Sequence, residues 1–140
     1  MKTINQFFEE KSHEYANDVM MHEKIGDQWI SSTYREIREQ VHQMAAGLQS
    51  LGLKKGDRVS LISEGRNAWA VSELGILYCG AVNVPLSVKL MEGSDLRFRI
   101  SHSGSKMVII SGGQARKLEG IKGELDTVEK FIYLDPKTSY

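Results

Sequence analysis

The residues best placed for chemistry follow a short apolar stretch in the second half of the chain. The segment Ser111-Gly112-Gly113-Gln114-Ala115-Arg116-Lys117 comes directly after Met107–Ile110, which has the composition of a buried strand. Backbone N–H groups of such a glycine turn can bind a phosphate, and Arg116 or Lys117 could add positive charge. An ordinary strand-to-helix loop with solvated basic side chains explains the same spacing. Both interpretations stay open on the residues alone.

The usual nucleotide-binding and catalytic patterns are absent from the sequence. No two glycines stand two residues apart, so G-x-G-x-x-G does not occur, and neither G-x-x-x-x-G-K-[ST] nor G-x-S-x-G is found. The histidines lack metal-ligand spacing and are expected at the surface; they are His13, His22, His42 and His102. Cys79 lies in an apolar segment and is expected to be a small buried hydrophobic residue. We therefore assign no catalytic residue and no metal ligand.

Composition narrows the class of protein. The 140 residues suit one domain, and we expect a single α/β unit over residues 1–140 without an internal repeat or linker. Lys plus Arg and Asp plus Glu both number 18, which gives no electrostatic case for nucleic acid or for a polybasic membrane contact. The chain begins without a signal-peptide pattern and contains no apolar stretch of transmembrane length. The expected compartment is the cytoplasm.

The elements that would carry the Ser111–Lys117 loop alternate between strands and helices. The segment Lys54–Leu86 reads as strand, helix and strand, with the helix over Trp69–Cys79 and Gly80 ending it. A second helix begins near Gly93-Ser94-Asp95, with Ser94 as its cap, and ends at Ser103-Gly104. Further strands are predicted at Met107–Ile110 and Lys130–Leu134, with a short weak helix between them. This order predicts an α/β fold with a mainly parallel sheet and helices on both faces.

Two helices and a hairpin are predicted ahead of this unit. Thr3 with Gln6, and Thr33 with Glu36, have the spacing of a capping box. The first helix carries an apolar face, formed by Ile4, Phe7, Phe8 and Tyr15. This face could pack on its own domain or on a neighbouring protomer, and packing on its own domain is expected. The second carries a continuous apolar stripe from Tyr34 to Leu51, followed by Gly52 where a left-handed residue is wanted. A small hairpin is predicted from Val19–Met21 and Gln28–Ile30 around Gly26-Asp27.

The ordered set of these residues resembles the front of the adenylate-forming acyl-CoA synthetases, most closely the long-chain fatty-acid–CoA ligases. The resemblance covers about Trp29 to Ile110. It is carried by Gly56-Asp57-Arg58-Val59, Ser63-Glu64, Arg66, Trp69-Ala70, Gly80-Ala81-Val82, Val84-Pro85-Leu86, Leu96, Phe98, Ile100, Ser103-Gly104 and Lys106. The sequence departs from the family with Gly65 in place of Asn, His102 in place of an acid, and Asn67 in place of Pro. Asn67 could cap the following helix instead.

The resemblance implies an enzyme that joins a fatty acid to coenzyme A using ATP and Mg²⁺. It also implies that this chain is an N-terminal piece of that enzyme, inactive alone. The family's Thr/Ser/Gly-rich phosphate loop, ribose-binding Asp and C-terminal Lys have no counterpart in these residues. Arg116, with Lys117 beside it, falls near a position where some relatives contact a phosphate of coenzyme A. A free-standing, non-catalytic α/β binding module is the alternative. A nucleotide-binding regulator would need a phosphate loop that the sequence lacks.

Overall fold

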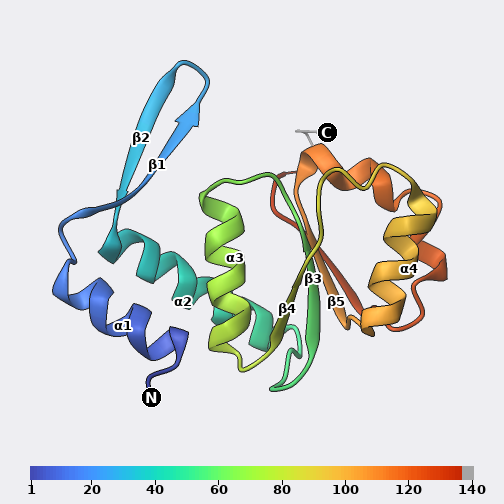
Figure 1. The fold of residues 1–140 in the computed structure, drawn as a ribbon, viewed down its shortest axis with the longest axis horizontal. Helices are drawn as coiled ribbons and strands as arrows, with labels where there is room; N and C mark the ends of the chain where they lie inside the picture. The colour runs from blue at the N-terminus through green and yellow to red at the C-terminus, as the bar shows by residue number, and fades with distance from the viewer. Residues whose placement is uncertain (137–140) are drawn as a thin grey trace.

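A parallel sheet forms the centre of the structure, which is a computed structural model and describes residues 1–136. The sheet has four strands in the order β4–β3–β5–β6 (Figure 1). They are β3 (Arg58–Ile62), β4 (Val82–Pro85), β5 (Met107–Ile110) and β6 (Lys130–Tyr133). Val59 of β3 lies opposite both Asn83 and Met107, so β3 is paired on each side. The predicted parallel sheet is confirmed.

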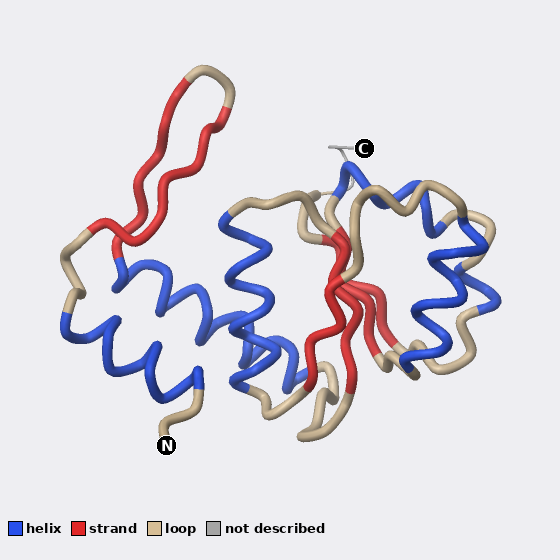
Figure 2. The backbone as a smooth tube through the Cα atoms, viewed as in Figure 1, coloured by secondary structure: helices blue, strands red, loops and turns tan. Residues whose placement is uncertain are grey.

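Helices cover both faces of this sheet, as the sequence predicts (Figure 2). Helices α2 (Tyr34–Ser50) and α3 (Asn67–Tyr78) lie on one face. Helix α4 (Gly93–Ser103) and the 3₁₀ helix η1 (Gly112–Leu118) lie on the other. Alternate side chains of each strand enter opposite cores, because successive residues of a strand point to opposite faces. Leu61 and Ile109 pack beneath α2 and α3, whereas Ile62 and Ile110 pack beneath α4.

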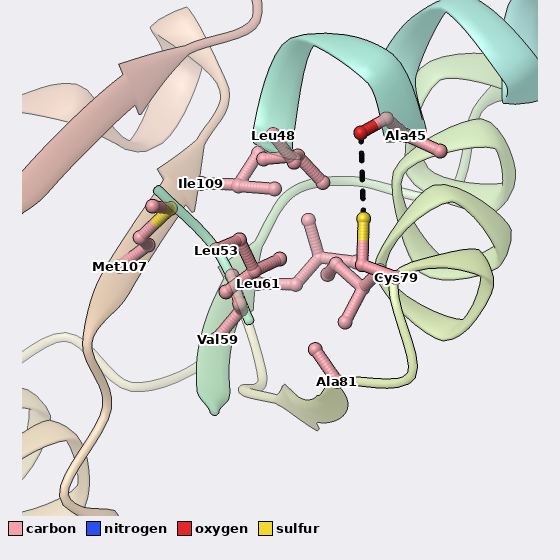
Figure 3. Packing of buried hydrophobic residues seen from close by; sticks show 10 residues of the cluster. Ala45, Leu48, Leu53, Val59, Leu61, Cys79, Ala81, Met107 and Ile109 are labelled. Carbon is pink, nitrogen blue, oxygen red and sulfur yellow. Dashed lines mark hydrogen bonds between the residues drawn. The ribbon is translucent and has the colours of Figure 1, made fainter. Parts of the chain in front are cut away.

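Cys79 belongs to the first of these cores (Figure 3). Its thiol is surrounded by Leu53, Leu61 and Ala81, and Sγ donates to the carbonyl oxygen of Ala45 at 3.4 Å. Burial raises the pKa of the Cys79 thiol, which disfavours the reactive thiolate. The prediction of a buried structural cysteine is confirmed.

The N-terminal quarter forms α1 (Ile4–Glu14) and an antiparallel hairpin of β1 (Val19–Ile25) and β2 (Gln28–Thr33). Both predicted capping boxes are present, at the starts of α1 and α2. The hairpin is longer than predicted and projects away from the sheet and its helices (Figure 1). Its turn contains Gly26 at φ +61°, a conformation that glycine adopts without strain.

The two predicted single-residue caps are wrong. An N-cap residue comes directly before the first helical residue. Helix α3 begins at Asn67 itself, so its N-cap is Arg66. Helix α4 is preceded by Glu92 as N-cap, and Ser94 is already inside its first turn. Neither N-cap residue makes a side-chain hydrogen bond to its helix. The preference of Asn and Ser for the N-cap position therefore located each helix start to within one or two residues but did not identify the N-cap residue.

The expected apolar face of α1 is largely uncovered in residues 1–136. Only Phe8 is buried among the residues predicted for it, while Ile4 and Phe7 are 66% and 56% exposed. A polar contact supplements the packing of α1, since Glu9 accepts a hydrogen bond from the Tyr78 hydroxyl at 2.6 Å.

The weak helix predicted after β5 is instead two 3₁₀ segments, η1 and η2 (Lys122–Glu124). Trp69, near the start of α3, is half-buried and packs against the core that contains Leu61.

Gly52 is confirmed as a left-handed residue after α2, with φ +98°. A Cβ added there would meet no atom within 4 Å, so any cost of substitution comes from the backbone. Gly52→Val is expected to lower the free energy of unfolding by about 1–3 kcal/mol, measured by urea denaturation. Gly47→Ala is the matched control, because Gly47 lies inside α2 with equally open surroundings and should gain stability. Equal stability of Gly52→Val and the parent chain would contradict the backbone argument.

Candidate functional site at the carboxyl end of the sheet

The candidate site lies where the carboxyl ends of β3 and β5 meet. After β3 the chain leaves toward α3 on one face, and after β5 it leaves toward η1 on the other. Adjacent parallel strands whose connections diverge in this way form a topological switch point, where α/β proteins commonly bind ligands. Glu64 and Arg66 follow β3 at this point, and Ser111 and Gly112 follow β5.

An ion pair joins the loop after β3 to the residues after β6. The two terminal guanidinium nitrogens of Arg66 donate to the two carboxylate oxygens of Asp135 at 2.8 and 2.7 Å. Hydrogen bonds from Arg66, and one from the backbone N–H of Gly112 at 2.7 Å, lower the pKa of Asp135. The same pair raises the pKa of Arg66. Such a bidentate pair fixes orientation as well as distance.

Glu64 is the second carboxylate of this network. It accepts hydrogen bonds from the Ser111 hydroxyl at 2.7 Å and from the Gln114 side-chain amide at 2.5 Å. Burial opposes its charged form, but these hydrogen bonds outweigh burial, and the pKa of Glu64 lies below its ordinary value. A Cβ added at Gly113 would stand 2.8 Å from Oε1 of Glu64, so glycine permits this close approach.

The network changes what the Ser111–Lys117 loop can do. The Gly112 N–H, which the sequence offered to a phosphate, already donates to Asp135. A phosphate at that position would also meet the negative charges of Glu64 and Asp135. The observed bonds instead tie together the loops after three neighbouring strands. Sequence reasoning missed this role, although the quoted resemblance included Glu64 and Arg66.

The two basic residues proposed for coenzyme A lie at the far end of η1. The side chain of Arg116 is exposed and makes no hydrogen bond or ion pair within residues 1–136, whereas its backbone carbonyl accepts a hydrogen bond from the Glu119 N–H. Lys117 is half-buried, and its ammonium donates to the carbonyl oxygen of Val88 at 2.5 Å, which ties η1 to the segment after β4. The structure therefore separates them: Arg116 is available to a ligand, whereas Lys117 is engaged within the protein.

A cleft of about 710 Å³ lies beside the network, between η1 and β6. Its lining includes Ala115, Leu118, Lys122, Tyr133 and Asp135. Lys122 brings positive charge to it, with its ammonium 4.4 Å from the centre of the Phe131 ring and 3.2 Å from the Tyr133 hydroxyl. The sequence offered no signal for this cleft, because its lining comes from two segments, 115–122 and 133–135, that no sequence pattern links.

Within the described part of the chain, no group of three or more His, Cys, Asp or Glu side chains is arranged to hold a metal ion. The carboxylates of Glu64 and Asp135 face hydrogen-bond donors of the surrounding loops. None of the helices in residues 1–136 combines the length and the hydropathy needed to span a bilayer.

Solved structures share the fold of this chain. The N-terminal domain of FACL13 from Mycobacterium tuberculosis, crystallised with an inhibitor, superposes with a TM-score of 0.89 at 28% identity. The match covers 96% of this chain and 34% of that one. The hairpin, the parallel sheet and the flanking helices therefore all belong to a known fold.

The curated relatives are longer proteins, and this chain matches only a part of each. The long-chain-fatty-acid–CoA ligase FadD13 of Mycobacterium tuberculosis is 31% identical over 109 residues, which is 76% of this chain and 22% of the relative. The ligase ACSBG2 of Xenopus laevis is 30% identical over 82 residues, which is 59% of this chain and 11% of the relative. A family model described as "AMP-binding enzyme" matches residues 8–139. Because that match spans nearly the whole chain, the protein belongs to the AMP-binding enzyme family, as its resemblance to the acyl-CoA synthetases predicted.

Proposed function

We propose that residues 1–140 form one N-terminal α/β unit of an ATP-dependent fatty acid–CoA ligase. The observation that carries the proposal is the family match over residues 8–139, supported by a long-chain-fatty-acid–CoA ligase 31% identical over 109 residues. This chain spans only 22% of that relative and 34% of the FACL13 N-terminal domain. The activity therefore belongs to a longer polypeptide, which we place in the cytoplasm, and the isolated unit is expected to be inactive.

The proposed reaction has two steps. A carboxylate oxygen of the fatty acid attacks the α-phosphorus of ATP, and pyrophosphate leaves with the electrons of the broken P–O bond. The thiol sulfur of coenzyme A then attacks the acyl carbon and loses its proton, and AMP leaves. Mg²⁺ would balance the phosphate charge in the first step. Its ligands, and the ATP-binding residues, would lie outside this unit.

The unit's own contribution would be to shape and stiffen one wall of the site. Its switch point lies at the carboxyl end of the sheet, where ligands of α/β proteins approach. The bonds of Glu64 and Asp135 hold the loops after β3, β5 and β6 in one arrangement. Catalytic groups from elsewhere in the polypeptide would face a surface that needs little reorganisation.

The proposal is tested on the longest polypeptide encoded by the gene that contains these residues. With ATP, Mg²⁺, coenzyme A and palmitate, it should form acyl-CoA, AMP and pyrophosphate in equal amounts. Butyrate in place of palmitate serves as the control for chain length. A gene product that ends near Tyr140 and binds none of these substrates would favour the free-standing binding module instead.

Arg116 is proposed to contact a phosphate of coenzyme A in the complete enzyme. Its guanidinium is exposed and has no ion pair within residues 1–136, so it can meet a phosphate without breaking an existing bond. Lys117 would contribute only if it released the carbonyl of Val88, and we expect its effect to be smaller.

Arg116→Ala should raise the KM for coenzyme A about fivefold in the complete enzyme, because an exposed charge-assisted contact contributes about 1 kcal/mol. The KM for ATP should stay unchanged. Arg99→Ala is a suitable control, since Arg99 is an exposed arginine on α4. An unchanged KM for coenzyme A in Arg116→Ala would remove Arg116 from the site.

A further inference from the structure

Helix α3 begins without a cap of its own, and a residue of the hairpin supplies one. Arg66 stands at the N-cap position and makes no side-chain bond to the helix. The first helical N–H, that of Asn67, donates to Oε1 of Glu23 on β1 at 2.8 Å, across a sequence separation of 44 residues. A helix N-terminus favours a carboxylate, because its free N–H groups and the helix dipole present partial positive charge.

The second strand of the hairpin reaches the same residue. The Asn67 side-chain amide donates to the Ser32 hydroxyl on β2 at 3.4 Å. At the hairpin's base, backbone bonds join Tyr34 to Asp18 and Arg35 to Ala16. Beyond these bonds the hairpin extends away from the helices (Figure 1), and Trp29 near its tip is 68% exposed.

The outer hairpin stands off from the loop after β3. A groove of about 630 Å³ separates them, lined by Trp29 and His22 on the hairpin side and by Gly65 and Arg66 on the other. Met20 and Met21 at the hairpin's base pack against a buried cluster from α1, α2 and α3. A two-stranded hairpin is only marginally stable without packing on a third element, so its outer part depends on the hydrogen bonds at Asn67.

Asn67 also adjoins the residue that organises the candidate site. Arg66 precedes it directly and holds Asp135 through both terminal nitrogens, and Asp135 in turn accepts the Gly112 N–H. A shift in the position of the start of α3 would therefore also move the loops after β5 and β6. We propose that Glu23 is a latch, which holds the outer hairpin against α3 and thereby fixes the position of Arg66 at the switch point.

The latch is tested on the 140-residue chain with Glu23→Ala and Glu23→Gln. Amide hydrogen exchange followed by NMR should show Asn67 exchanging about fivefold faster in Glu23→Ala, the effect of losing a typical helix cap. Glu23→Gln should recover part of the protection, because its side-chain oxygen still accepts a hydrogen bond. Asp27→Ala is the matched control, since it removes another hairpin carboxylate, in the exposed turn.

Two further readouts separate a latch from a simple helix cap. Spin labels at Gln28→Cys and Gln49→Cys, in a Cys79→Ala background, should give a narrow distance distribution that broadens with Glu23→Ala. The Asp135 carboxyl, followed by NMR, should titrate at higher pH in the same variant, because Arg66 is less well placed. Unchanged Asn67 exchange would overturn the proposal. Faster Asn67 exchange with an unchanged distance distribution and Asp135 titration would overturn it too, since Glu23 would then be a cap alone.

Discussion

Replacing Ile109 with alanine is expected to lower the free energy of unfolding by about 3–4 kcal/mol, within the range measured for large-to-small changes in tight cores. Ile109 is fully buried in the middle of β5, opposite Leu61 on β3 and Ile132 on β6. Its side chain packs in the same cluster as Leu48 of α2 (Figure 3). Removing it would leave a cavity between the sheet and α2.

Urea denaturation of the 140-residue chain measures this loss. Val82→Ala is the control, because Val82 also lies in the sheet but is 47% exposed, and it should cost well under 1 kcal/mol. A loss below about 1 kcal/mol for Ile109→Ala would contradict a tightly packed centre of the sheet.

Replacing Asp135 with asparagine is expected to destabilise the chain by about 2 kcal/mol at pH 7, because it removes a charge-assisted pair with Arg66. The effect should disappear in acid. Hydrogen bonds from Arg66 and Gly112 hold the pKa of Asp135 below its ordinary value, so its stabilisation is present above about pH 4. That stabilisation is lost as the pH falls through the lowered pKa of the folded protein.

The measurement is the free energy of unfolding as a function of pH for the parent and Asp135→Asn. The two curves should converge as the pH falls below 4. Glu64 has a lowered pKa as well, so both proteins should still lose some stability in acid. Asp126→Asn, at an exposed acid near the opposite end of the sheet, is the control and should follow the parent. Parallel curves for Asp135→Asn and the parent would show that the pair does not stabilise the fold.

Sequence reasoning succeeded where the determinants are local. Thr3 and Gln6 are three residues apart and form the predicted capping box, as do Thr33 and Glu36. The parallel arrangement of β3 and β4 followed from one apolar strand, one helix and Gly80, which adopts φ +68° at the helix end. In each case the interacting residues are neighbours in the chain or follow a fixed period.

It failed where partners are distant in sequence. Arg66 and Asp135 are 69 residues apart, so no periodicity links them, yet they organise the candidate site. The cap of α3 was assigned to Asn67 from residue preference, whereas Glu23 of the hairpin accepts the first N–H. The apolar residues of α1 correctly indicated a helix. These residues did not show which of them pack against another element, and in the structure Phe8 is buried whereas Phe7 is exposed.

We propose that these residues are the scaffold of an enzyme that activates fatty acids as adenylates. ATP–pyrophosphate exchange, measured without coenzyme A, isolates that first step. We expect exchange that depends on palmitate in the longest polypeptide encoded by the gene, and none in residues 1–140 alone. Palmitate-dependent exchange by the isolated 140 residues would contradict the placement of the chemistry outside this unit. Absence of exchange in the complete polypeptide would contradict the proposed activity itself.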